Sequence, residues 1–216
     1  MQRIDTTAIT TYSIPRLLLM DHAGLGVARA VQSLSVRPGA TRVFVCCGTG
    51  YNGGDGLAAA RYLHEWGYPL DVLVLGRLNT LRAEPATFAA ILQRLRVPIT
   101  EVTSLTTLSQ ATHRLARCRL IIDALLGLGM RGVVREPMAS LIKRMNDSGR
   151  PIIAADIPSG LDGDTGRVAN VAVRATMTVT FGLAKRGCLR GEGPGYTGSL
   201  IIDPITIPRV LLEGKS

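Results

Sequence analysis

Hydrophobic runs that end in small, polar, glycine-bearing loops recur along the chain. Four segments show the pattern most clearly, namely VFVCC-GTGYNGGDG (43–56), LIID-ALLGLGMRG (120–132), IIAAD-IPSG (152–160) and MTVTF-GLAKRG (177–187). A short β-branched run bounded by turn residues is typical of a buried strand. Because ligands of a parallel α/β sheet bind outside the carboxyl ends of its strands, we expect the four loops to converge on one site.

The hydrophobic periodicity alternates between strand-like and helix-like along the chain. It predicts strands at 42–47, 70–75, 99–102, 119–123, 151–155, 176–181 and 199–203. It predicts helices at 15–34, 53–67, 83–95, 104–116 and 136–147. This order indicates right-handed βαβ units and therefore an α/β fold with a mostly parallel sheet. The length of 216 residues suits one domain over 1–216.

Composition narrows the choice of partners. The chain has three Phe, five Tyr and one Trp, which argues against an aromatic platform for nucleic acid. A net charge of +9 favours an anionic partner, but the basic residues are spread from Arg3 to Lys215 without a run. A phosphorylated small molecule is therefore at least as plausible as RNA, and we expect no nucleic-acid partner.

Neither a membrane segment nor a cysteine-based site is expected. Residues 1–30 carry polar and charged side chains throughout, unlike a signal peptide or a membrane span, so we expect a cytoplasmic protein that does not bind membranes. The four cysteines lack C-x-x-C spacing, and the adjacent pair Cys46 and Cys47 should point to opposite faces of a strand. A disulfide or a zinc site is therefore not expected.

The loop Gly48–Gly56 follows a strand and opens a helix, where backbone N–H groups favour an anion. Gly48, Gly50 and Gly53 fit the G-x-G-x-x-G spacing, although a tight strand-to-helix turn would look the same. Asn52 and Asp55 are less usual in such a loop, because a carboxylate repels phosphate unless it holds the loop or a cation.

Carboxylates end two of the other strands. Asp123 precedes the loop 124–132, in which Gly127, Gly129 and Arg131 offer donors suited to a phosphate. Its carboxylate is either a loop cap or an oxygen ligand, and the residue alone does not decide between them. Asp156 precedes Pro158 and Ser159 and is either a turn cap or an acid/base group.

The last of the four loops holds Lys185, which is either a solvated lysine or a member of the site. Asp162 and Asp164, followed by Thr165-Gly166, look like turn residues rather than catalytic ones.

Taken together, GTGYNGGDGLAAARYL, DALLGLGMRG, AADIPSGLDGDTG and TVTFGLAKRG resemble the NAD(P)HX epimerase family, the YjeF N-terminal domain fold. The resemblance extends over about residues 1–208, and residues 4–24 look like the N-terminal helix of that family, with Asp21 where Glu is more usual. It implies a three-layer αβα sandwich with a Rossmann-like sheet. It also implies an isomerase, commonly dimeric, that interconverts the R and S epimers of hydrated NADH and NADPH.

The family's functional residues can be carried onto this chain. The substrate-binding positions would be Tyr51, Asn52, Gly53, Gly54, Asp55, Gly127, Leu128, Gly129, Met130, Arg131, Gly132, Val133 and Asp156. Asn52, Asp123 and Ser159 would bind a potassium ion, and Asp156 and Lys185 would be catalytic. Tyr51 departs from the family, which usually has Asn-Asn at positions 51 and 52.

The resemblance also implies partners and leaves alternatives open. A NAD(P)H-hydrate dehydratase, often fused at the C-terminus in this family, would be the functional partner, either as a separate chain or as part of a longer one. A non-catalytic binding or scaffold module is the alternative function. A nicotinamide-dependent oxidoreductase ranks third, because it needs an acidic residue where the second strand ends and this chain has Gly76 and Arg77.

Overall fold

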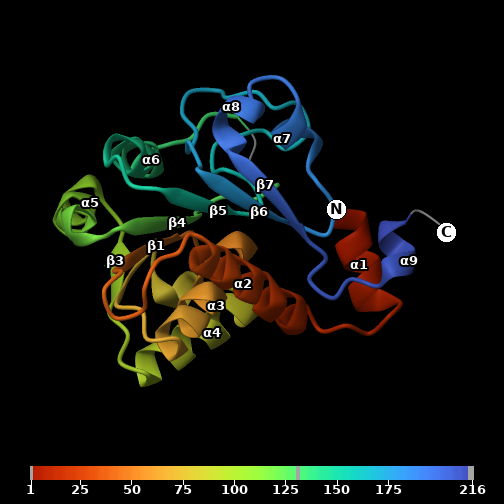
Figure 1. The fold of residues 1–216 in the computed structure, drawn as a ribbon, viewed down its shortest axis with the longest axis horizontal. Coiled ribbons are helices and arrows are strands. Elements are labelled where there is room, and N and C mark those ends of the chain that lie inside the picture. Colours follow the sequence, from red (N-terminus) through yellow and green to blue (C-terminus); the bar gives the residue numbers. More distant parts are fainter. Residues whose placement is uncertain (1, 130–131, 214–216) are drawn as a thin grey trace.

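The computed structural model describes residues 2–129 and 132–213. Within them, seven strands form one sheet in the order β3-β2-β1-β4-β5-β6-β7, and all neighbouring strands are parallel (Figure 1). The strands are β1 (Val43–Cys47), β2 (Leu70–Leu75), β3 (Ile99–Val102), β4 (Leu120–Ala124), β5 (Ile152–Ala155), β6 (Met177–Phe181) and β7 (Ser199–Asp203). All expected strands are present, with ends within one residue of the prediction.

Helices cover both faces of the sheet, so the expected three-layer αβα fold is confirmed. On one face lie α2 (Arg16–Ser33), α3 (Tyr51–Glu65) and α4 (Ala83–Arg94), and on the other lie α5 (Leu105–Thr112) and α6 (Met138–Asp147) (Figure 1). The hydrophobic periodicity did not predict α1 (Gln2–Thr10), α7 (Arg186–Leu189), α8 (Pro194–Thr197) and α9 (Arg209–Leu212). Only the resemblance placed a helix over residues 4–24, where the structure has two, α1 and the first part of α2. Among the described residues, no helix combines the length and the apolar character needed to cross a bilayer.

The two faces of the sheet have separate cores because side chains alternate along each strand. On β1, Val45 and Cys47 pack into the core under α2 and α3, whereas Phe44 and Cys46 pack into the core under α5 and α6. All five residues of this strand are buried, as expected for a central parallel strand. The adjacent cysteines therefore point to opposite faces, as predicted.

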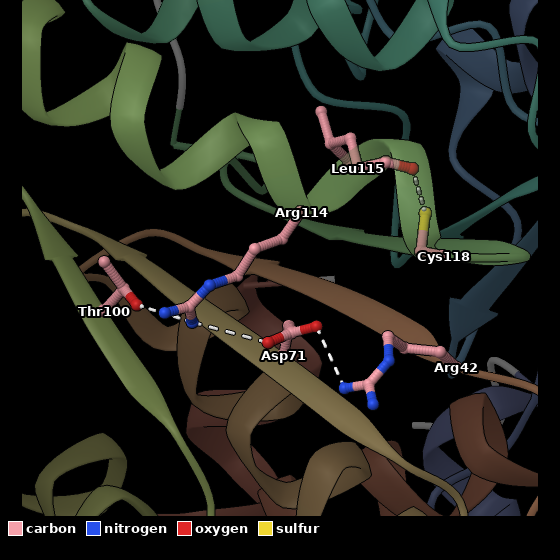
Figure 2. A network of polar contacts seen from close by, with 6 residues as sticks. All are labelled: Arg42, Asp71, Thr100, Arg114, Leu115 and Cys118. Atoms are coloured by element: carbon pink, nitrogen blue, oxygen red, sulfur yellow. Dashed lines mark hydrogen bonds and ion pairs between the residues drawn. The ribbon is translucent and has the colours of Figure 1, made fainter.

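Two ion pairs share Asp71 near the amino ends of the strands. Asp71, at the start of β2, accepts hydrogen bonds from Arg42 Nη1 at 3.2 Å and from Arg114 Nη1 at 3.4 Å (Figure 2). Arg114 also donates to Thr100 on β3. Asp71 is only 7% exposed, so its charge relies on these two partners. The network links segments that are far apart in the sequence, away from the strand ends that carry the glycine loops.

Candidate active site

A cleft of about 740 Å³ opens at the carboxyl ends of the central strands. The strand order reverses between β1 and β4, which is where ligands bind in open parallel sheets. The loops after β1, β4, β5 and β6 each contribute lining residues, among them Gly48, Asn52, Leu126, Gly127, Asp156 and Lys185. The predicted convergence of the four loops is therefore confirmed.

The loop after β1 is shorter than predicted because α3 begins at Tyr51 rather than at residue 53. Much of the glycine segment is thus the first turn of a helix. The loop packs so tightly that a Cβ atom on Gly48 would lie 2.1 Å from the carbonyl oxygen of Leu125. A Cβ on Gly53 would lie 1.9 Å from the carbonyl oxygen of Gly48. Glycine at position 48 lets the loops after β1 and β4 touch, and glycine at position 53 lets α3 begin close against Gly48.

Asp123 and Ser159 form a fully buried hydrogen-bonded pair. The backbone N–H of Ser159 donates to Asp123 Oδ2 at 2.8 Å, and its hydroxyl donates to Oδ1 at 2.6 Å. The backbone N–H of Leu126 in turn donates to Ser159 Oγ at 2.8 Å. Burial raises the pKa of Asp123 to about 6, although the hydrogen bonds from Ser159 oppose the shift. The pair joins the end of β4 to the loop after β5.

Asn52 has a side-chain oxygen without a hydrogen-bond partner, and like Ser159 it is hydrogen-bonded to Leu126. Its Nδ2 donates to the carbonyl oxygen of Leu126 at 3.0 Å, whereas its buried Oδ1 accepts no hydrogen bond within the described residues. A buried acceptor without a donor is costly, and a cation would satisfy it. Amide, carboxylate and hydroxyl oxygens are ligands for hard cations, so Asn52, Asp123 and Ser159 fit a potassium ion chemically.

Asp156 and Lys185 form an ion pair inside the cleft. Lys185 Nζ contacts Asp156 Oδ1 and donates to the carbonyl oxygen of Phe181 at 2.7 Å. The side chains of the lysine and the aspartate are only 3% and 14% exposed. Lys185 is therefore a buried member of the site, not a solvated loop lysine.

The backbone conformation and hydrogen bonds of Asp156 hold its carboxylate next to Lys185. The residue has φ +68°, a left-handed conformation that is uncommon outside glycine, asparagine and aspartate. Its N–H donates to the carbonyl oxygen of Val179 at 2.7 Å, and the N–H of Phe181 donates to its Oδ1 at 3.1 Å. The carboxylate is thus fixed by β6 and by the lysine that follows it.

Two further carboxyl groups line the cleft near Asp156. Burial raises the pKa of Asp55 well above its ordinary value, the charge of Asp156 adds to the shift, and Lys185 opposes it. Burial also raises the pKa of Asp5, again with Asp156 adding and Lys185 opposing. Because α1 delivers Asp5 from outside the four loops, no loop motif in the sequence pointed to it. The arrangement can hold and transfer protons.

The remaining predicted substrate-binding residues fall into three groups. Gly127, Leu128 and Gly129 line the cleft together with Tyr51. Gly53 and Gly54 are buried and Gly132 and Val133 are exposed, and none of these four lines the cleft. Met130 and Arg131 lie outside the described residues.

Asp162 is a turn residue, as expected. Its Oδ1 accepts hydrogen bonds from the N–H groups of Asp164 and Thr165 at 3.0 and 2.7 Å. Such bonds fix a turn through the side chain of its first residue.

Comparison with known proteins identifies relatives for most of the chain. Residues 16–187 match the family model described as YjeF-related protein N-terminus. A bifunctional NAD(P)H-hydrate repair enzyme of Pyrobaculum aerophilum is 45% identical over 195 residues, covering 90% of this chain and 38% of that protein. The NAD(P)H-hydrate epimerase of Limosilactobacillus fermentum is 37% identical over 202 residues, covering 94% and 92% of the two chains.

A solved structure shares the fold. The crystal structure of the yeast protein ynu0 (YNL200c) matches with a TM-score of 0.84 and 25% identity, over 97% of this chain and 88% of that one. The chain thus spans about two fifths of the bifunctional relative and nearly the whole length of the bacterial epimerase.

Proposed function

Because the chain belongs to the family of YjeF-related protein N-termini, we propose that it is an NAD(P)H-hydrate epimerase that interconverts the R and S epimers of hydrated NADH and NADPH. The observation that carries the proposal is the buried Asp156–Lys185 pair in a cleft built by four glycine-bearing loops. A binding module would have no need to keep a carboxylate and an ammonium group buried together in a ligand cleft.

The chemistry of the substrate assigns Asp156 the role of proton carrier. Carbon 6 of the hydrated ring bears a hydroxyl group beside the ring nitrogen. In one route, Asp156 protonates the hydroxyl, the C–O bond breaks, and water returns to the other face of the resulting iminium while its proton goes back to Asp156. In the other, Asp156 takes the hydroxyl proton and passes it to the ring nitrogen as the C–N bond breaks. The nitrogen then attacks the other face of the resulting aldehyde, and its proton returns through Asp156 to the carbonyl oxygen. Both routes need one carboxyl group that gives a proton and takes one back.

Lys185 and the neighbouring acids support this role. The ammonium group holds Asp156 Oδ1 in one direction and offers a positive charge beside developing negative charge. Burial raises the pKa of Asp55 and of Asp5, which places two further carboxyl groups able to exchange protons beside Asp156.

Replacing Asp156 tests the proposal. Asp156→Asn keeps the shape and tolerates the left-handed backbone, so the fold should persist while epimerisation slows by about 10²- to 10⁴-fold. The ratio of purified epimers, followed by chromatography, measures the rate. Asp147→Asn makes the same chemical change on an exposed residue of α6 and should have no effect. An Asp156→Asn variant as fast as the wild type would contradict the assignment.

We propose that potassium is the cofactor, bound by Asn52, Asp123 and Ser159. The cation would add a fixed positive charge near the phosphates of the substrate. Binding to the folded state alone raises the melting temperature, so potassium should stabilise the wild type more than lithium does. In Asn52→Leu, which lacks the unpartnered oxygen, the two salts should give the same melting temperature. Equal effects of both salts on the wild type would count against the site.

We further propose that the chain works in the cytoplasm, as one domain and as a homodimer, alongside a NAD(P)H-hydrate dehydratase. The bifunctional relative in P. aerophilum supports a dehydratase as the functional partner in hydrate repair.

Exposed apolar side chains such as Leu18, Leu189 and Ile202 support the proposed homodimer, because a second copy of the chain would bury them. Light scattering that gives only the monomer mass of 23.0 kDa would exclude the dimer.

A further inference from the structure

Two arginines converge on Tyr51 at the start of α3. The guanidinium carbons of Arg16 and Arg82 each lie 4.5 Å from the centroid of the Tyr51 ring. Arg16 begins α2, Tyr51 begins α3, and Arg82 immediately precedes α4. We call these three residues the arginine clamp. Three helix starts therefore place two cations on one aromatic ring.

The clamp lies in the same cleft as Asp156 but at its more exposed side. All three clamp residues line the cleft. Tyr51 is 36% exposed and Arg82 is also exposed, whereas Lys185 is only 5% exposed. A substrate whose reacting ring reaches Asp156 would therefore extend past the clamp toward solvent.

The acidic and basic side chains lie in different parts of the cleft, with the acids in its buried part and the arginines at its exposed side. The inner part holds the carboxyl groups of Asp5, Asp55 and Asp156 around the ammonium group of Lys185. Among the described residues that line this inner part, the ammonium group of Lys185 is already paired with Asp156, whereas the guanidinium groups of the clamp can bind phosphate oxygens. The negatively charged part of a dinucleotide is thus directed to the clamp.

Arg82 is available for such a contact. Among residues 2–129 and 132–213 it has no carboxylate partner, whereas Arg16 is 3.6 Å from Glu84 Oε1. Stacking on an aromatic ring orients the guanidinium plane and leaves its N–H edge free for bidentate bonds. The first turn of α3, preceded by Gly50 without a side-chain cap, adds the positive end of a helix dipole.

We propose that the arginine clamp is the phosphate-binding subsite of the cleft and that Arg82 is its main ligand for a phosphate of the hydrated dinucleotide. The inference rests on the proposed epimerase function and deepens it. The phosphate is either the pyrophosphate, shared by hydrated NADH and NADPH, or the 2′-phosphate, which only hydrated NADPH carries.

Arg82→Gln separates these two sources. Loss of a charged hydrogen-bond donor should lower kcat/KM by about ten- to a hundred-fold, mainly through KM because Asp156 and Lys185 remain in place. An equal loss on both hydrates identifies the pyrophosphate, and a loss confined to hydrated NADPH identifies the 2′-phosphate. Undiminished kcat/KM on both hydrates would overturn the proposal.

Two further variants distinguish recognition from general charge. Arg77→Gln removes the same charge from the same β2–α4 connection at a residue outside the cleft lining, and it should leave kcat/KM unchanged. Tyr51→Leu keeps both arginines but removes the ring that orients them, so it should give a smaller loss than Arg82→Gln. A loss as large in Arg77→Gln would mean that net charge alone attracts the substrate.

Calorimetric titration with NADH and NADPH separates the clamp from the proposed activity. Both probes carry the phosphates whether or not the protein epimerises their hydrates. If the wild type fails to accelerate epimerisation but Arg82→Gln still weakens nucleotide binding, the function is wrong and the clamp stands. If the wild type epimerises but Arg82→Gln binds both nucleotides as tightly as the wild type, the clamp is wrong.

Discussion

At the scale of single residues, the site depends on backbone positions that few side chains tolerate. Asp156 occupies a left-handed conformation, and Gly48 and Gly53 allow two backbone segments to touch. The sequence singled out Asp156 and Gly48 because each directly follows a strand. It could not predict their contacts, because the partners Phe181, Lys185 and Leu125 come from distant segments and meet them only in the folded chain.

Gly53→Ala should destabilise the protein although alanine is the better helix former. The added Cβ would lie 1.9 Å from a backbone oxygen, and relieving that contact requires the loop to move, so we expect a loss of about 1–3 kcal/mol in the free energy of unfolding. Gly50→Ala is the control, because no atom lies within 4 Å of its added Cβ. Urea denaturation that gives equal stabilities for the two variants would contradict the packing argument.

Asp5 should make stability depend on pH. Its folded pKa is raised above the ordinary value of 3.8, mainly by burial, so the folded state binds more protons than the unfolded state in that range. The free energy of unfolding therefore falls as pH rises from about 4 through the raised pKa, and above that pKa the effect of Asp5 no longer changes with pH. Asp5→Asn removes this pH-dependent effect. The stability of the variant minus that of the wild type should therefore be larger near pH 7 than near pH 3, and a difference that does not change with pH would refute the idea.

At the scale of elements, the strands were easier to predict than the short helices. Long runs such as residues 70–75 identify a buried strand by composition alone, because parallel strands are apolar on both faces. By contrast, α7, α8 and α9 have four residues each and follow from tertiary packing, not from periodicity. The sequence showed α1 only through its likeness to a family, although it carries Asp5 into the cleft.

The network at Asp71 should stabilise the sheet without affecting the site. Asp71→Asn removes the charge that Arg42 and Arg114 share, and we expect a loss of about 1–2 kcal/mol because both arginines are partly exposed and screened (Figure 2). Denaturation at low and high salt measures the effect, which should shrink as salt rises. The proposed epimerase activity should stay at the wild-type rate, and a slower rate would mean that this end of the sheet is coupled to the cleft.

At the scale of the whole molecule, the sheet order determines where the chemistry lies. The four loops predicted to converge follow β1, β4, β5 and β6, which are consecutive in the sheet, so their convergence follows from parallel pairing. The sequence could predict this convergence because parallel strands all end on the same side of the sheet, so the loops that follow them lie together. It missed the arginine clamp, because Arg16 and Arg82 come from helix starts outside those loops and carry no motif of their own.

The ion pair between Asp156 and Lys185 has a consequence for how such chains diverge. Losing either residue alone leaves the other as a buried charge without its partner, which costs about 3–5 kcal/mol. Substitutions of the two residues should therefore be tolerated together more readily than singly. Among relatives of this fold, the aspartate and the lysine should be present together or absent together, and frequent loss of one without the other in a sequence alignment would contradict this.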